Sequence, residues 1–144
     1  MENQIKIRYG WLKGMYIYTA IGAGLSGLGF ILVPETSVSL WKMPAQDPIN
    51  FGILGSVYLA FGLVSLLGIR SPLKFVPILF LQMLYKIIWF IGVISPMFFK
   101  GQLPQYAIVF IIIFATYIIG DIIAIPFNYV CLCSGEKTEQ ENAI

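Results

Sequence analysis

Four long stretches of the chain are almost without charge, and their length decides what the chain can fold into. They cover residues 14–33, 49–69, 75–99 and 106–127, and each holds at least 20 residues. At a rise of 1.5 Å per residue, a helix of about 20 residues crosses a hydrocarbon layer about 30 Å thick. Because backbone polar groups in lipid must be satisfied within the segment, we expect each stretch to be a membrane-spanning helix.

The composition agrees with a membrane protein and argues against a soluble one. Hydrophobic residues make up 58% of the chain and charged residues only 11%, whereas a soluble domain is about 25% charged. A soluble fold with so few charges would expose large apolar patches. The lipid bilayer is therefore the expected partner, and no basic array indicates nucleic acid. The first stretch is too long for the apolar region of a cleaved signal peptide.

The links between the stretches predict an all-α, up-down-up-down four-helix bundle. Residues 70–74 and 100–104 are short connections, which make neighbouring helices antiparallel. One side of the membrane then carries most of the lysines and arginines, namely Lys6, Arg8, Lys13, Arg70, Lys74 and Lys137, against Lys42 and Lys100 on the other. Since basic residues favour the cytoplasmic side, we expect both termini there. The organisation is then a cytoplasmic segment 1–13, a transmembrane domain 14–127 and a polar cytoplasmic tail 128–144.

Small residues in the first stretch are spaced for close helix packing. The segment 22–27 matches the dinucleotide-binding pattern G-x-G-x-x-G, but it lies inside an unbroken apolar run and lacks the strand-turn-helix context of that motif. The same positions form small-xxx-small pairs that let two membrane helices approach each other. We therefore predict a packing role for Gly22, Gly24, Ser26 and Gly27.

The second stretch repeats this pattern on two faces. Gly52, Ser56 and Ala60 follow one another at intervals of four, whereas Gly62, Ser65 and Gly68 follow at intervals of three. These stripes predict tight contact with the first helix, with a further membrane partner, or with a second copy in a homodimer. One sequence does not separate these alternatives.

Only two formal charges, Lys86 and Asp121, fall within the four stretches. A charge near the bilayer centre costs about 2.5–3.5 kcal/mol on insertion scales, and such residues commonly mark functional sites. Lys86 and Asp121 lie on consecutive antiparallel helices, with a difference in depth of about 7–8 Å. Because both side chains lean so as to reduce that difference, a direct or water-bridged pair is feasible.

Polar neighbours extend this pair into a candidate ligand or ion site. Gln82 lies one turn from Lys86, Tyr117 lies one turn from Asp121, and Tyr85 and Trp89 are close along the chain. Two interpretations stay open. The pair is either a substrate, ion or proton site, or a buried ion pair that fixes the register of the third and fourth helices.

Two further segments have weaker signals. Residues 34–44 predict a short interfacial helix or a lid over a site, because Pro34 suits a first helical turn and Leu40 and Trp41 suit the headgroup region. Cys131 and Cys133 have C-x-C spacing, which favours two reduced thiols over a redox or metal site, with palmitoylation as the alternative. The chain contains no histidine, so we expect no metal site and no cofactor.

The layout of the whole chain resembles the small bacterial four-helix membrane proteins called DoxX-like. The resemblance rests on Pro34-Glu35 after the first stretch, on small residues in 51–56, on Gly68-Ile69-Arg70, and on Lys86 and Asp121 in the last two stretches. It covers residues 14–127 and implies a four-helix fold in a bacterial inner membrane. Redox activity in the membrane is not supported, because the chain has no histidine and no C-x-x-C motif.

These observations favour a protein that binds or transports a small ligand or ion between the third and fourth helices. The alternative is an accessory or structural membrane subunit in which Lys86 and Asp121 fix the helix register. A membrane enzyme is the least favoured class, because acid–base chemistry usually needs a fuller cluster of titratable groups.

Overall fold

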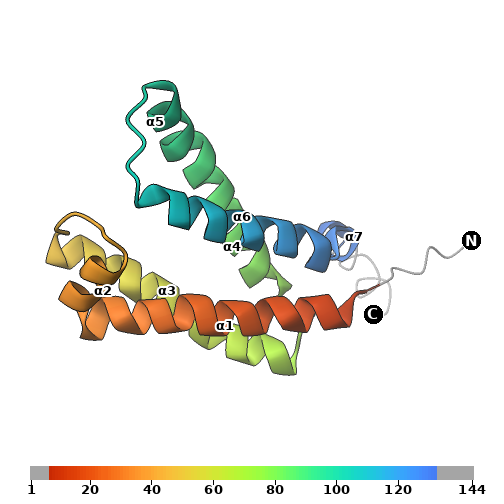
Figure 1. The fold of residues 1–144 in the computed structure, drawn as a ribbon. Helices are drawn as coiled ribbons and strands as arrows, with labels where there is room; N and C mark the ends of the chain where they lie inside the picture. The colour runs from red at the N-terminus through yellow and green to blue at the C-terminus, as the bar shows by residue number, and fades with distance from the viewer. Residues whose placement is uncertain (1–6, 133–144) are drawn as a thin grey trace, which may run out of the picture.

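The computed structural model describes residues 7–132 and contains only helices and their connections within that range (Figure 1). Four helical segments are long and apolar enough to cross a membrane: Tyr9–Leu32, Pro48–Arg70, Val76–Phe99 and Ala107–Ala124. The prediction of a helical, multi-pass membrane protein is therefore confirmed. Lys6, Cys133, Lys137 and most of the predicted tail lie outside the described residues.

The helices follow the predicted stretches closely. Helix α1 is Tyr9–Leu32, α3 is Pro48–Arg70 and α6 is Ala107–Ala124. The third span is made of α4 (Val76–Trp89), a π-helical turn (Phe90–Ile94) and α5 (Ser95–Phe99). Helix α1 begins five residues before the predicted apolar stretch, because Lys13 is the only charged residue in 9–13 and a lysine near a helix end extends its ammonium group toward water.

Local sequence determines where several helices begin and end. Helix α3 begins where the Asp47 side chain accepts a hydrogen bond from the Asn50 backbone N–H at 2.9 Å, with Pro48 in the first turn. Helix α6 ends at Ala124 because the residue before Pro126 is restricted to extended conformations, and Ile125 has ψ 122°. The chain then continues as α7 (Phe127–Leu132).

Helices α1 and α3 form a tight antiparallel pair through glycine. A Cβ on Gly62 would lie 2.5 Å from the Gly24 Cα, and a Cβ on Gly27 would lie 2.6 Å from the Gly55 carbonyl oxygen. Near the other end of the pair, Gly68 lies against the ring of Tyr16. Glycine is needed at these positions because any side chain would separate the two backbones.

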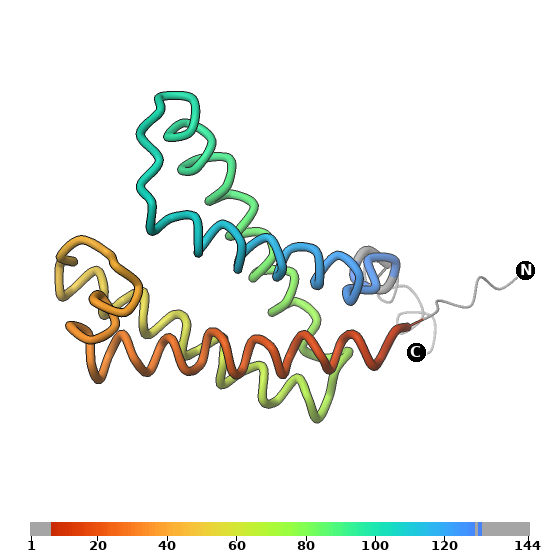
Figure 2. Tube along the Cα trace, viewed as in Figure 1, coloured from red at the N-terminus to blue at the C-terminus, as the bar shows by residue number. Residues whose placement is uncertain are grey.

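The third span and α6 pack more loosely on this pair. Gln82 contacts Asp121, whereas Trp89, seven residues after Gln82, contacts Phe114, seven residues before Asp121, so α4 and α6 are antiparallel. Figures 1 and 2 show α4 and α5 inclined away from α1 and α3, with α6 running beside α1. The bundle is therefore closed at the α7 end and splayed at the end that carries α2 (Pro34–Leu40).

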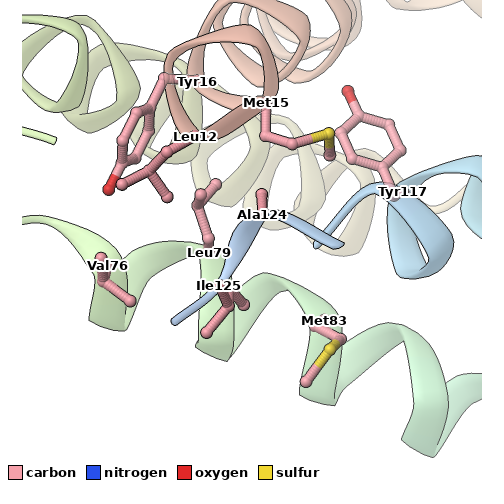
Figure 3. Close-up of a cluster of buried hydrophobic side chains, with 9 residues drawn as sticks. All are labelled: Leu12, Met15, Tyr16, Val76, Leu79, Met83, Tyr117, Ala124 and Ile125. Carbon is pink, nitrogen blue, oxygen red and sulfur yellow. The ribbon is translucent and has the colours of Figure 1, made fainter. Parts of the chain in front are cut away.

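The main hydrophobic cluster closes the half of the bundle near α7 (Figure 3). It joins the start of α1, the start of α4 and the end of α6, through Leu12, Met15, Tyr16, Val76, Leu79, Met83, Tyr117, Ala124 and Ile125. Outside the bundle, large apolar side chains are exposed, among them Ile17 (46%), Leu25 (64%) and Leu63 (56%). Such a surface suits lipid better than water.

Candidate functional site: a buried lysine beside an aromatic cavity

The polar residues that the sequence singled out come together in the middle of the bundle. Gln82 and Lys86 lie on α4 and are 1% and 2% exposed, while Asp121 on α6 is fully buried. Tyr117, one turn before Asp121 on α6, is 4% exposed. Because Gln82 and Lys86 are one helical turn apart, they lie on the same face of α4.

Asp121 is bound by Gln82. The Gln82 Nε2 donates a hydrogen bond to the Asp121 Oδ2 at 3.1 Å, whereas the Asp121 Oδ1 has no hydrogen-bond partner among the described residues. No direct ion pair joins Asp121 to Lys86 within residues 7–132. The physical reason is depth: one helical turn, about 5.4 Å, separates Gln82 from Lys86, so the amide meets the carboxylate first.

Two buried hydroxyl oxygens also have no hydrogen-bond partner among the described residues. The Thr19 Oγ1 on α1 and the Ser65 Oγ on α3 make no hydrogen bond among the described residues, and both residues are fully buried. Unsatisfied buried polar groups are uncommon and often indicate bound water.

Lys86 is surrounded by aromatic rings. Its Nζ donates a hydrogen bond to the Tyr85 hydroxyl at 2.9 Å. The same Nζ lies 4.3 Å from the ring centroids of Tyr85 and Tyr117, and 5.3 Å from that of Phe114. These are cation–π distances, and the interaction is strongest where water is excluded. The direct contacts of the Lys86 Nζ are therefore with a hydroxyl and ring faces.

The Lys86 side chain lines a cavity of about 240 Å³ in the α2 half of the bundle, which we name the aromatic cavity. Most of its wall is ring or small side chain, contributed by α1, α3, α4, α6 and the loop after α2. The lining residues are Tyr18, Gly22, Ala23, Ser26, Phe30, Trp41, Tyr58, Tyr85, Lys86, Phe110, Ile113, Phe114 and Tyr117.

Within the wall, the rings hold one another in place. Tyr18 stacks on Tyr117 with centroids 4.3 Å apart, and the Tyr117 hydroxyl donates to the Tyr18 carbonyl oxygen at 3.2 Å. The Tyr18 hydroxyl also shares a hydrogen bond with the Thr116 Oγ1 at 2.9 Å. Gly22 leaves the space that the Tyr117 hydroxyl occupies.

Trp41 contributes the part of the wall nearest α2. The predicted short helix is present as Pro34–Leu40, and Trp41 directly follows it. The Trp41 ring lies 5.3 Å from that of Phe110 on α6. The contact between Trp41 and Phe110 favours a lid over a headgroup anchor for Trp41. Leu40, in contrast, is 74% exposed.

A turn of unusual conformation fixes Trp41 in this position. Lys42 has φ 53°, its N–H bonds to the Ser39 carbonyl oxygen, and the Met43 N–H bonds to that of Val38. This is the Schellman ending of a helix, in which glycine usually occupies the left-handed position. A lysine there costs about 1–2 kcal/mol relative to glycine.

A second cavity of about 550 Å³ lies on the other side of the same rings. It shares Tyr58, Tyr85, Phe110 and Phe114 with the aromatic cavity. Part of its remaining wall follows α3 and the chain before it, through Met43, Gln46, Asn50, Ile53, Leu54 and Val57. The rest comes from Trp89 at the end of α4 and Tyr106 just before α6. Trp89 therefore contributes to this second cavity and packs on Phe114 at 4.9 Å.

The residues assigned to packing are divided between two kinds of position. Gly22, Gly24 and Gly27 each face another helix, and Ser26 lines the aromatic cavity. Gly52 has no atom of another helix within 4 Å of its Cβ position. Ser56 and Ala60, on the same stripe, are exposed. The contact with α1 is made by Gly55, Gly62 and Gly68.

Sequence reasoning missed most of the cavity wall, although one signal was present. Phe110, Phe114 and Tyr117 are spaced at i, i+4 and i+7, which places three rings on one face of α6. Tyr18, Tyr58 and Trp41 come from three other segments, and only the packing of those segments brings them together. Among the described residues, no three His, Cys, Asp or Glu side chains are grouped so that they would hold a metal ion.

Comparison with known proteins finds no match: no family, no curated protein and no solved structure resembles the chain at a significant level. The resemblance to DoxX-like proteins therefore stays a prediction. Four apolar helices define a multi-pass membrane protein, and any more specific function has to be argued from the aromatic cavity.

Proposed function

We propose that this chain is an up-down-up-down membrane protein that binds a small organic molecule in the aromatic cavity, with Lys86 as the polar anchor. The observation that carries the proposal is the position of Lys86. Its ammonium group lines a ring-walled cavity, and its hydrogen-bond partner is a neutral hydroxyl, with no carboxylate of residues 7–132 in direct contact. Cavities with apolar walls and one placed polar group are typical of small-molecule sites.

An organic ligand fits this cavity better than an inorganic ion. A hydrated or oxygen-coordinated cation needs several oxygen ligands, and the nearest positive group would repel it. A small inorganic anion would gain Lys86 but would leave the ring-lined remainder of about 240 Å³ unfilled. Transport of the bound molecule stays a prediction, since it requires a second, differently open conformation.

We place the protein in a bacterial inner membrane, with both termini on the cytoplasmic side. Arg8, Lys13, Arg70 and Lys74 are exposed near the α7 half, and Lys42 and Lys100 are exposed near the α2 half. Basic residues accumulate on the cytoplasmic side of membrane proteins. The aromatic cavity then lies in the outer half of the bilayer.

A test of the proposal is to fill the cavity from its wall. We expect detergent-solubilised protein to bind tritiated 2-naphthol in a scintillation proximity assay, and Ser26→Phe to weaken this binding at least about tenfold by occupying the space. Leu25→Phe is the matched control, since the neighbouring side chain is 64% exposed on the outside of α1. Equal loss in both variants, or no loss in either, would count against the cavity as the site.

A structural role for Asp121 is the second candidate, and its hydrogen bond with Gln82 favours it. That contact joins α4 to α6 in the centre of the bundle. In this case the chain would be an accessory membrane subunit whose buried polar contact specifies one helix arrangement. Naphthol binding that is insensitive to Ser26→Phe, together with strong destabilisation by Gln82→Leu, would favour it over ligand binding.

A further inference from the structure

We infer that the bound molecule is a compact hydrophobic monoanion: one carboxylate-type group on a body of one or two rings, or of similar bulk. This inference rests on the proposed function and adds the chemical class of the ligand. Lys86 specifies the charge of the ligand, and the cavity specifies its size and the character of its body.

The charge follows from what Lys86 lacks. An ammonium group has three N–H donors, and the structure gives it one hydroxyl acceptor, on Tyr85. The other neighbours within cation–π distance are the rings of Phe114 and Tyr117, which compensate a charge less than an anion does. The one intramembrane carboxylate, on Asp121, is engaged by Gln82 instead. A carboxylate at Lys86 would supply the charge-assisted hydrogen bond that the protein itself does not.

Two other ligand charges fit less well. An aromatic cage often binds quaternary ammonium groups, but the Lys86 ammonium lines this one and would repel a cation. A neutral molecule would fill the space and leave the buried charge as it is. A dianion would need a second basic group, and Lys86 is the only basic residue among the described residues that line the wall.

The body of the ligand follows from the wall and its volume. Rings of Tyr18, Trp41, Phe110 and Phe114 surround the space, and flat apolar groups stack well on such rings. A volume of about 240 Å³ lies below the range of about 300–1,000 Å³ that is usual for drug-sized ligands. The aromatic cavity thus suits an aromatic acid or a short acyl acid, and it excludes a two-chain phospholipid.

The second cavity suggests how such an acid reaches Lys86. It shares four aromatic side chains with the aromatic cavity and follows the lipid-exposed side of α3, where Ile53 is 58% exposed and Val57 45% exposed. Trp41 on Phe110 covers the end near α2. A hydrophobic acid dissolved in the bilayer meets these side walls before it meets Lys86.

The experiment compares probes that differ in charge and body. Tritiated 2-naphthoate, 2-naphthylmethanol, 2-naphthylmethylammonium and octanoate are titrated against the full chain in nanodiscs by scintillation proximity. The variants are Lys86→Met, Lys86→Arg as the charge-conserving change, and Lys74→Met as the exposed control. Monodispersity on size exclusion shows whether each variant is folded.

The inference predicts that naphthoate binds the parent protein at least about tenfold more tightly than the alcohol, and that the ammonium probe binds weakest. Lys86→Met should remove the preference for the acid over the alcohol, Lys86→Arg should keep part of it, and Lys74→Met should keep all of it. If octanoate binds with the same dependence on Lys86, the natural source is an acyl acid; if only naphthoate does, it is an aromatic acid.

Two results would overturn the inference, and they can be told apart. In the first, the acid and the alcohol bind equally well, and Ser26→Phe blocks the binding of both. The cavity would then bind ligands without selecting their charge, so the proposed function would stand and the inference would be wrong. No binding of any probe above that of empty nanodiscs would contradict both. If Lys86→Met does not fold, the Lys86→Arg protein and the comparison of acid, alcohol and ammonium on the parent protein still decide the question.

Discussion

At the scale of single residues, the two intramembrane charges have different surroundings and therefore different roles. Asp121 is fully buried and hydrogen-bonded to Gln82. Lys86 faces rings and a cavity. The sequence showed that both residues would be buried and close, because charge within an apolar stretch must face the bundle interior. It did not show that Gln82 would replace Lys86 as the partner of Asp121, since this depends on how α4 and α6 slide past each other.

Removing the Gln82 amide should destabilise the bundle. Gln82→Leu leaves both carboxylate oxygens of Asp121 without a partner, and an unsatisfied buried polar group costs about 1–3 kcal/mol. The measurement is unfolding in mixed micelles with increasing SDS. Gln102→Leu, at an exposed site in the loop after α5, should change stability little. Equal stability of Gln82→Leu and the parent protein would show that the hydrogen bond is not structural.

The left-handed turn after α2 predicts an unusual gain from glycine. Lys42→Gly should raise the free energy of unfolding by about 1 kcal/mol, because φ 53° is strained for lysine and open to glycine. Lys100→Gly is the comparison: Lys100 has φ −84°, so glycine there should give no gain. Thermal unfolding of the parent protein and of both variants measures the difference in stability. A loss of stability in Lys42→Gly would show that the left-handed conformation at Lys42 is not strained.

At the scale of the elements, glycine contacts determine how α1 and α3 pack. The sequence predicted this pairing from two small-residue stripes but did not identify which stripe faces α1. Gly55 and Gly62, which both contact glycines of α1, are seven residues apart and follow the period of about 3.5 residues of left-handed helix pairs. Gly52, Ser56 and Ala60 follow a strict interval of four and turn to the outside. The stripe of α3 that contacts α1 could therefore not be identified from the sequence, because a second small-residue stripe lies on the same helix.

Two glycine substitutions on α3 separate these faces. Gly62→Ala should destabilise the protein by about 1–3 kcal/mol, because overpacking a close contact forces the backbones apart. Gly52→Ala, on the outer stripe, should be neutral or stabilising by up to about 1 kcal/mol through helix propensity. Unfolding temperatures of both variants in the same detergent provide the measurement. A larger loss for Gly52→Ala than for Gly62→Ala would contradict the pairing of α1 with α3, and would favour an interface with a second copy on the outer stripe.

At the scale of the whole molecule, the two halves of the bundle differ in packing. The half near α7 is filled by the hydrophobic cluster (Figure 3), and the half near α2 is splayed (Figure 1). The splayed half holds both cavities. Charge-free length was enough to predict the four spans, since a bilayer sets the length of a helix. The aromatic cavity was not predictable in the same way, because its wall comes from four helices and a loop whose tilt the sequence pattern does not encode.

The proposed orientation can be tested on intact cells. With Cys131 and Cys133 replaced by serine, Lys100→Cys should react with a membrane-impermeant maleimide added outside, and Lys74→Cys should react only after lysis. Both positions are exposed in the structure, so a difference in labelling reports the side of the membrane. The reverse pattern would place the aromatic cavity in the cytoplasmic half of the bilayer.

The binding of an acid at Lys86 is tested most directly by locating the bound molecule in a crystal. Crystals of the full chain grown with 6-bromo-2-naphthoate would show bromine by its anomalous scattering. We expect one bromine peak inside the aromatic cavity between α1 and α6, with the carboxylate at the Lys86 Nζ, and no such peak in crystals of Ser26→Phe. Bromine found only on the lipid-facing surface, or in the cavity with the carboxylate turned away from Lys86, would contradict it.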